Sequence, residues 1–229
     1  LNLLADNPDH RSANEFLGLI YIRNGDFVNA EKVFQTQISI NPESAVVYSQ
    51  LAQARQAQDN LAGAADAYQK GLNALPGDIR LLIGSAGLEE ARKNFDVAIS
   101  LYEQVLAKQP DNAVSINNLA ALLSDHRQDA DSLDKAAALA AKLENTDQPA
   151  FLDTAGWVYY RKGDYDKAIE VLKSVVEKAP KVPVFRYHLG MAYLKKGDKE
   201  VAREHLLKAT DGDFKYEGVE EARVALGSL

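Results

Sequence analysis

Few side chains of this chain could do chemistry at a defined site. The four histidines, His10, His126, His188 and His205, are far apart, and no two have the i, i+4 spacing that places ligands on one helix face. Because a metal site needs three or four converging ligands, the sequence predicts separate packing or surface histidines. Cysteine is absent, which excludes disulfides, thiolate ligands and a cysteine nucleophile.

Carboxylates are plentiful, but their positions point to helix caps and outer helix faces. The densest pair within a helix, Glu89–Glu90, is expected on a solvated face. No G-x-S-x-G, Walker-type loop or H-E-x-x-H motif occurs. We therefore expect neither an enzyme nor a cofactor.

One aromatic cluster remains as a candidate binding site. The segment LDTAGWVYYRKGDYDKAIEVL, residues 152–172, holds the only tryptophan, Trp157, beside Tyr159 and Tyr160. Aromatic rings at helical spacing serve either as ligand contacts or as ordinary packing. The helices that carry these rings decide between the two interpretations.

These helices are predicted by a repeat. Prolines recur every 34 residues at Pro8, Pro42, Pro76 and Pro110, and a second series recurs between them: RNGDFVNA, QDNLAGA, RKNFDVA, RKGDYDKA and KKGDKEVA. A fixed period of this length is typical of stacked helical arrays. A Gly-Asp pair ends one helix and caps the next, and proline near the boundary ends the second helix. Each repeat is therefore predicted to be a helix hairpin.

Small residues recur where the two helices of a hairpin must approach closely. Gly18, Gly156 and Gly190 occur in first helices, and large residues such as Phe34 and Leu172 occur in second helices. A small residue facing a large one sets a short interaxial distance, so these positions predict interlocking pairs.

The motifs resemble those of tetratricopeptide repeat (TPR) proteins: Leu17, Gly18, Tyr21, Ala30 and Phe34 fit that pattern, as do their counterparts in later repeats. The resemblance implies an all-α, right-handed α-solenoid of about six TPR helix hairpins plus a C-terminal capping helix. We expect residues 1–10 to end a preceding repeat helix, so that the sequence is part of a longer protein, and residues 215–229 to form the capping helix. The predicted repeats are 11–44, 45–78, 79–112, 113–148 (irregular, with 36 residues), 149–182 and 183–214.

Charge limits the class of partner. The net charge is −7, which argues against nucleic acid or an anionic membrane, and no apolar run is long enough to span a bilayer. Residues 149–210 are mildly basic, with 12 Lys and Arg against 8 Asp and Glu. At most this segment offers a polar face to an acidic partner, and a solvated surface is the alternative.

In TPR proteins the first helices line the concave surface, and the resemblance implies which positions face inward. In the fifth and sixth repeats those positions hold aromatic, thioether and cationic side chains, which are typical of interface hot spots. Packing against neighbouring helices is the alternative interpretation. Tyr159 occupies a conserved packing position of the family and is expected to be structural. The candidate partner-binding residues are Trp157, Tyr160, Arg161, Tyr187, Met191 and Lys195.

The resemblance implies a non-catalytic scaffold that binds a protein partner in its groove. The segments NNLAALL and FRYHLGMAYLKKGDKEVAREHL also resemble terminal repeats of bacterial TPR proteins of exopolysaccharide export, including PEP-CTERM systems. This favours a periplasmic or cell-envelope location. A cytoplasmic adaptor and direct polysaccharide binding are the alternatives. The family's carboxylate clamp is not expected, because the matching positions, among them Glu15, Gln50 and Gly84, lack its cationic set.

Overall fold

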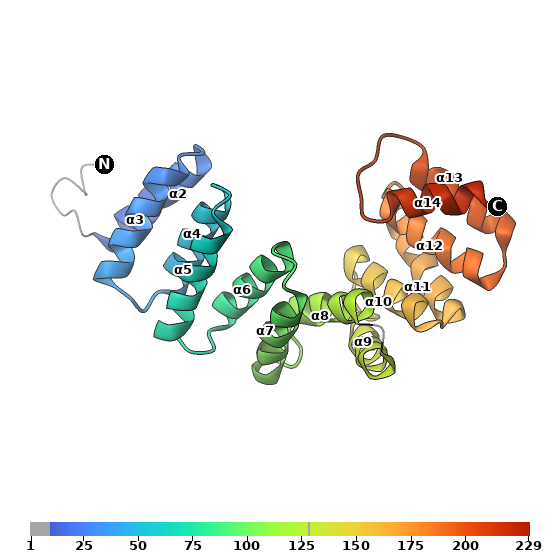
Figure 1. Cartoon of the computed structure of the whole chain (residues 1–229), viewed down its shortest axis with the longest axis horizontal. Coiled ribbons are helices and arrows are strands. Elements are labelled where there is room, and N and C mark those ends of the chain that lie inside the picture. Colours follow the sequence, from blue (N-terminus) through green and yellow to red (C-terminus); the bar gives the residue numbers. More distant parts are fainter. Residues whose placement is uncertain (1–9, 128) are drawn as a thin grey trace. The chain divides into compact units, whose positions relative to one another are not determined.

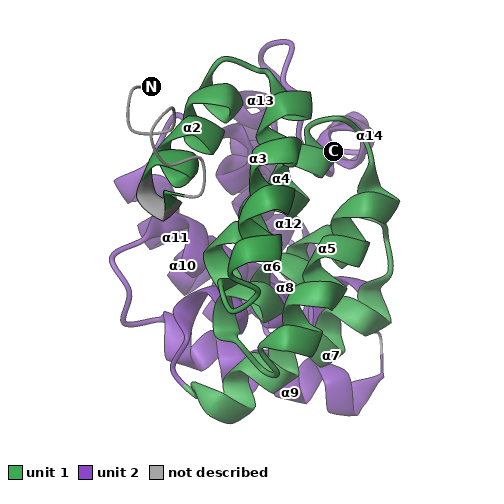
Figure 2. Ribbon diagram, turned by 90° about the vertical axis from the view of Figure 1, so that its left-hand side faces the viewer, with its two compact units in different colours: residues 1–110 green, residues 111–229 purple. Residues whose placement is uncertain are grey.

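The computed structural model describes residues 10–127 and 129–229, which contain helices and no strand. They belong to two compact units, residues 1–110 and 111–229 (Figure 2). The described part of the first unit holds α2 (Arg11–Arg23), α3 (Phe27–Ile40), α4 (Ala45–Gln56), α5 (Leu61–Ala74), α6 (Ile79–Ala91) and α7 (Phe95–Lys108). The second unit holds α8 (Ala113–His126), α9 (Ala130–Leu143), α10 (Pro149–Lys162), α11 (Tyr165–Lys178), α12 (Pro183–Lys196), α13 (Lys199–Thr210) and α14 (Val219–Gly227) (Figure 1).

Within each unit the helices pack as consecutive hairpins. In the first unit α2 packs on α3, α4 on α5 and α6 on α7, and in the second unit α8 packs on α9, α10 on α11 and α12 on α13. Helix α10 also contacts both α8 and α12, so the first helices of successive hairpins lie next to one another. Helix α14 packs on α13 and α12. The predicted all-α fold of TPR hairpins is confirmed. The preceding helix expected at residues 1–10 lies outside the described residues except for His10, whose side chain caps α2.

The turn inside a hairpin is set by one residue of positive φ. This angle is 74° at Gly25, 59° at Asp59, 61° at Lys93, 88° at Gly163 and 96° at Gly197. Glycine adopts this conformation without a steric penalty, whereas Asp59 and Lys93 carry a Cβ into it. The next residue is the N-cap of the second helix, and in three hairpins its side chain accepts a backbone N–H of that helix: Asp26, Asn60 and Asp164.

In the fourth hairpin, the helix ends on either side of residue 128 are described. Arg127 at the end of α8 is extended, with φ −126°. Helix α9 is then capped by Asp129, whose carboxylate accepts the N–H of Ser132 at 2.8 Å. Ala140, where other repeats carry a large side chain, is fully buried.

The predicted interlocking pairs are confirmed. A Cβ added to Gly18 would lie 2.4 Å from Phe34, one added to Gly156 2.5 Å from Leu172, and one added to Gly190 2.8 Å from Leu206. These distances are shorter than any ordinary carbon–carbon contact. Glycine is therefore what allows the two helices of these hairpins to come so close.

The expectation of a solvated Glu89–Glu90 pair is wrong. Glu89 is only 7% exposed and accepts hydrogen bonds from Arg92 at 2.7 Å and from the Asn94 amide at 2.6 Å. Glu90 accepts the hydroxyl of Tyr102 at 2.5 Å. Both carboxylates hold the third hairpin together: Glu89 ties the turn to α6, and Glu90 ties α7 to α6.

Candidate functional site

The second unit contains an open pocket of about 420 Å³ along its first helices. We call it the Trp157 pocket. Most of its lining comes from three neighbouring helices, and the remainder comes from residues 217–221, which include the first residues of α14. The lining residues are Ala121, Asp125 and His126 of α8; Asp153, Thr154, Trp157 and Arg161 of α10; Val184, Tyr187 and His188 of α12; and Glu217, Gly218 and Glu221.

Trp157 is fixed by contacts on both neighbouring helices. Its ring stacks on Tyr160, with centroids 4.5 Å apart, and on His188, with centroids 4.2 Å apart. Its indole Nε1 donates to the Asp125 carboxylate at 3.0 Å. The side chain remains partly exposed and lines the pocket. Trp157 therefore combines a packing role with a surface that a ligand can reach.

The six candidate residues divide into two groups. Trp157, Arg161 and Tyr187 line the pocket. Tyr160 and Met191 are 8% and 4% exposed and lie outside the lining, so they pack within the unit. Lys195 is exposed near the end of α12 and also lies outside the lining. Tyr159, expected to be structural, is 8% exposed and donates its hydroxyl to Glu144 at 2.5 Å.

Tyr187 forms the most buried part of the lining, with 2% exposure. Its hydroxyl donates to Glu221 Oε2 at 2.7 Å, and a Cβ added to Gly218 would lie 2.4 Å from its ring. Gly218 also has φ 94°, so two constraints require glycine there. Burial and the Glu221 carboxylate raise the pKa of Tyr187, which stays a neutral hydroxyl donor. Burial raises the pKa of Tyr160 to about 12, with a smaller contribution from Glu221.

Polar contacts made by lining side chains join the three helices α8, α10 and α12. Arg161 Nε donates to the Ser124 carbonyl at 3.1 Å, and the same nitrogen lies 3.8 Å from the Asp125 carboxylate. His188 Nδ1 lies 2.9 Å from each oxygen of Asp153. Since α8 and α12 are both bonded to α10 in this way, the lining side chains are held in place before any ligand arrives.

The repeat pattern could not reveal the contribution of residues 217–221. Glu217, Gly218 and Glu221 lie beyond the last repeat, so no period assigns them to the groove. The sequence predicts His188 to be a separate packing or surface histidine, although it directly follows Tyr187 at an inward position. In the sequence, residues 217–221 can be recognised by Gly218 and by the glutamates on either side of it.

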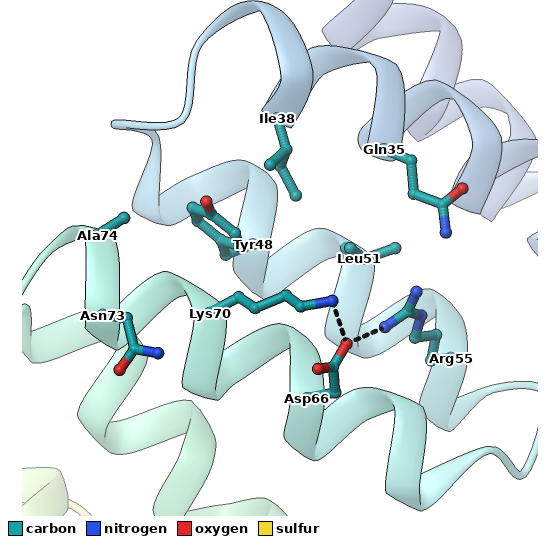
Figure 3. A pocket seen from close by; sticks show the side chains of 9 residues that line it. All are labelled: Gln35, Ile38, Tyr48, Leu51, Arg55, Asp66, Lys70, Asn73 and Ala74. Atoms are coloured by element: carbon teal, nitrogen blue, oxygen red, sulfur yellow. Dashed lines mark hydrogen bonds and ion pairs between the residues drawn. The ribbon is translucent and has the colours of Figure 1, made fainter.

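A second pocket, of about 610 Å³, lies in the first unit (Figure 3). It is lined by α3, α4 and α5, and it includes none of the positions expected to face inward. There the Asp66 carboxylate accepts from Lys70 at 2.9 Å and from Arg55 at 3.3 Å. Arg55 also bonds to Glu31 at 2.8 Å and to the Gly63 carbonyl at 2.8 Å. The Arg55–Glu31 pair joins two adjacent hairpins, whereas the Asp66 pairs lie within the second hairpin, and both have a structural role.

Two further findings concern the part of the chain that the structure describes. No group of three or more His, Cys, Asp or Glu side chains there is arranged to hold a metal ion. None of its helices is long and apolar enough to cross a membrane.

Comparison with known proteins agrees with the fold of helix hairpins. The family model described as tetratricopeptide repeat matches residues 1–45 and 154–214. The TPR repeat-containing protein PA4667 of Pseudomonas aeruginosa is 33% identical over 153 residues, which are 66% of this chain. The chain spans only 26% of the length of that relative.

Solved structures show the same fold. The structure of YrrB, described as a TPR protein with an unusual peptide-binding site, has a TM-score of 0.66 at 21% identity, covering 86% of this chain and 98% of YrrB. A TPR protein from Parabacteroides merdae has a TM-score of 0.69 at 14% identity, covering 95% and 98%. A chain of the Cut9–Hcn1 hetero-tetramer of APC/C has a TM-score of 0.72 at 15% identity, covering 99% of this chain and 44% of that one. The chain therefore carries tetratricopeptide repeat motifs in residues 1–45 and 154–214 and has the fold of the solved TPR structures.

Proposed function

We propose that the chain is a non-catalytic scaffold that binds a segment of a partner protein in the Trp157 pocket. The TPR fold supports a protein-interaction role in general, and TPR proteins are generally non-catalytic. The observation that carries the proposal is the pocket itself, which exposes a partly buried Trp157 beside Arg161 and Tyr187. Trp, Tyr and Arg are the side chains most enriched among interface hot spots.

The pocket is organised as a binding site with a fixed lining and an accessible rim. Tyr187 is almost fully buried and hydrogen-bonded, whereas Asp125, Glu217 and Glu221 are exposed. A preformed lining lowers the ordering cost of association, because the side chains lose little freedom on binding. A volume of about 420 Å³ accommodates a few side chains of a bound segment.

Direct polysaccharide binding is less well supported than binding of a protein segment. Stacking on a sugar needs an open aromatic face, but the indole of Trp157 already stacks on Tyr160 and His188. Oligosaccharides that shift the fluorescence of the single tryptophan would support the alternative instead.

For the biological setting, we propose a bacterial envelope assembly of polysaccharide export or secretion. This rests on the resemblance of NNLAALL and FRYHLGMAYLKKGDKEVAREHL to terminal repeats of exopolysaccharide-export proteins. A cytoplasmic adaptor is the competing proposal. A signal peptide or lipobox in the full gene, together with fractionation of the cells, separates the two. Recovery of the full-length protein in the cytoplasm alone would overturn the envelope proposal.

The binding proposal is tested by site-specific photo-crosslinking in the full-length protein. A photoreactive phenylalanine at Thr154, which lines the pocket, should capture a partner segment on irradiation. The same residue at Lys173, which is exposed on α11 outside the lining, is the matched control. Crosslinking from Thr154 no stronger than from Lys173 would refute the proposal.

A further inference from the structure

The rim of the Trp157 pocket carries more negative than positive charge. Four carboxylates line it, from Asp125, Asp153, Glu217 and Glu221, and Arg161 is its single Lys or Arg. Residues 111–229 as a whole carry 20 Asp and Glu against 17 Lys and Arg. The excess at the pocket is therefore local, and it differs from the basic character that the sequence of residues 149–210 suggested.

We propose that the segment bound in the Trp157 pocket is cationic, with lysine or arginine side chains that reach the carboxylates of the rim. The inference rests on the proposed function, since it specifies the chemistry of the same partner segment. Such a segment is opposite in charge to the acidic partner that the basic residues 149–210 could at most accommodate.

The four carboxylates differ in how many hydrogen bonds and ion pairs they already form within the protein. Asp153 places both oxygens against His188, and Asp125 uses Oδ1 for the Trp157 indole and Arg161. Glu221 uses Oε2 for the Tyr187 hydroxyl. Glu217 has no hydrogen bond or ion pair to the described residues. The second oxygens of Asp125 and Glu221 and the whole of Glu217 therefore remain as acceptors for a ligand.

The positive charge of the lining is largely offset. Arg161 directs its Nε to the Ser124 carbonyl and lies 3.8 Å from the Asp125 carboxylate. An anionic segment would meet Glu217 and Glu221 without a free cation to compensate, and like charges at close range weaken binding. A cationic segment would instead gain several charge-assisted contacts.

The aromatic lining fits the rest of a basic side chain. Lysine and arginine bury their aliphatic stems on apolar surface and keep the charged head near water. The partly exposed Trp157 offers such surface directly beside the rim carboxylates.

The single tryptophan supplies the assay. Three synthetic peptides of equal length, free of tryptophan, carry lysine, glutamine or glutamate at the same positions and are titrated while Trp157 fluorescence is followed. We expect the lysine peptide to bind at least about tenfold more tightly than the glutamate peptide, and to weaken as salt rises. Equal affinities, tighter binding of the glutamate peptide, or no binding of the lysine peptide would overturn the inference.

Variants assign the effect to the rim. Asp125→Asn combined with Glu217→Gln removes two charges, and asparagine can still accept the hydrogen bond from the Trp157 indole. The matched control is Glu177→Gln with Asp213→Asn, at two exposed positions outside the pocket. The rim double variant should bind the lysine peptide about tenfold more weakly than the wild type, with an unchanged melting temperature. The control double variant should bind it as tightly as the wild type does. Equal affinity of the two double variants would overturn the inference.

The two proposals fail in distinguishable ways. If the photoreactive residue at Thr154 captures no segment, the proposed function fails. If it captures a segment that lacks lysine and arginine, the proposed function stands and the cationic character is refuted. Mass spectrometry of the crosslinked peptide gives this answer directly.

Discussion

Replacing Gly156 by alanine tests how the fifth hairpin is packed. A Cβ at this position would lie 2.5 Å from Leu172 Cγ and 2.7 Å from Cδ2. Non-bonded carbons prefer about 3.5–4 Å, so the helices or the leucine must move by about 1 Å. Leu172 is fully buried, and close-packed interiors leave little room for such a shift.

Two effects of opposite sign set the magnitude. Extra volume in a packed core costs about 1–3 kcal/mol. Alanine in place of glycine inside a helix contributes up to about 1 kcal/mol of stability. Because the new contact is with the branch point of Leu172, we expect the steric cost to dominate, and Gly156→Ala should lower the free energy of unfolding by about 1–2 kcal/mol.

A double-mutant cycle separates the two effects. Leu172→Ala alone removes the partner side chain and should cost about 2–5 kcal/mol. In that background the new methyl of Gly156→Ala meets no leucine, so the substitution should stabilise by up to about 1 kcal/mol. The sign of the same substitution therefore reverses, with a coupling of about 2–3 kcal/mol between the two positions.

The assay is urea unfolding followed by circular dichroism and by Trp157 fluorescence. Arrays of repeats can depart from two-state unfolding, so the fluorescence is needed to follow the unit that contains α10. Gly87→Ala is the control, because a Cβ on exposed Gly87 in α6 meets no atom within 4 Å. If Gly156→Ala stabilises as much as Gly87→Ala, or if its effect keeps the same sign in the Leu172→Ala background, the packing argument is refuted.

Three other predictions concern the rest of the chain. Lys93→Gly relieves the left-handed conformation at φ 61° and should raise stability by about 0.5–1 kcal/mol in urea unfolding. Arg55→Ala removes the links to Glu31 and to a neighbouring carbonyl and, discounted for partial exposure, should cost about 1–3 kcal/mol in the same assay. Burial and Arg186 lower the pKa of His205 from its ordinary 6.5. As the pH falls, the unfolded chain therefore binds the proton before the folded chain does, and the free energy of unfolding should decrease below pH 6.5. Urea unfolding of the wild type and of His205→Asn between about pH 5 and 8 measures this decrease.

Each of these predictions has its own control. Gly163→Ala, at φ 88°, should destabilise by about as much as Lys93→Gly stabilises, and a gain from both would contradict the turn argument. Arg55→Lys should recover only part of the loss, because one ammonium cannot reproduce the bonds of Nε and Nη1. If His205→Asn loses stability with falling pH as steeply as the wild type, the titration belongs to another group.

The hairpins could be predicted because their determinants are local. A Gly-Asp turn acts over a few residues, and Gly156 meets Leu172 only 16 positions later in the sequence, inside one repeat. The same register predicted that Trp157, Arg161 and Tyr187 face one surface, and all three line one pocket. Periodicity therefore carries information about the face of a helix as well as its existence.

Other features could not be predicted because they depend on contacts that vary between repeats. Tyr160 occupies an inward position by register, yet it is buried against Trp157. Glu89 looked solvated because nothing in its own helix showed that Asn94 and Arg92 would turn back to it. A period assigns a position to a face, but it does not say which neighbour covers that face.

The Trp157 pocket is lined in part by residues 217–221, which follow the sixth predicted repeat. Identical hairpins present similar side chains to a groove, and a segment outside the period can add different ones. Gly218, held by its φ of 94° and by the ring of Tyr187, brings Glu217 and Glu221 to the rim, and Glu221 then fixes the hydroxyl of Tyr187. Residues 217–221 therefore supply two of the four carboxylates of the lining, and these two contribute to the selectivity proposed for this site beyond what the repeat motif supplies.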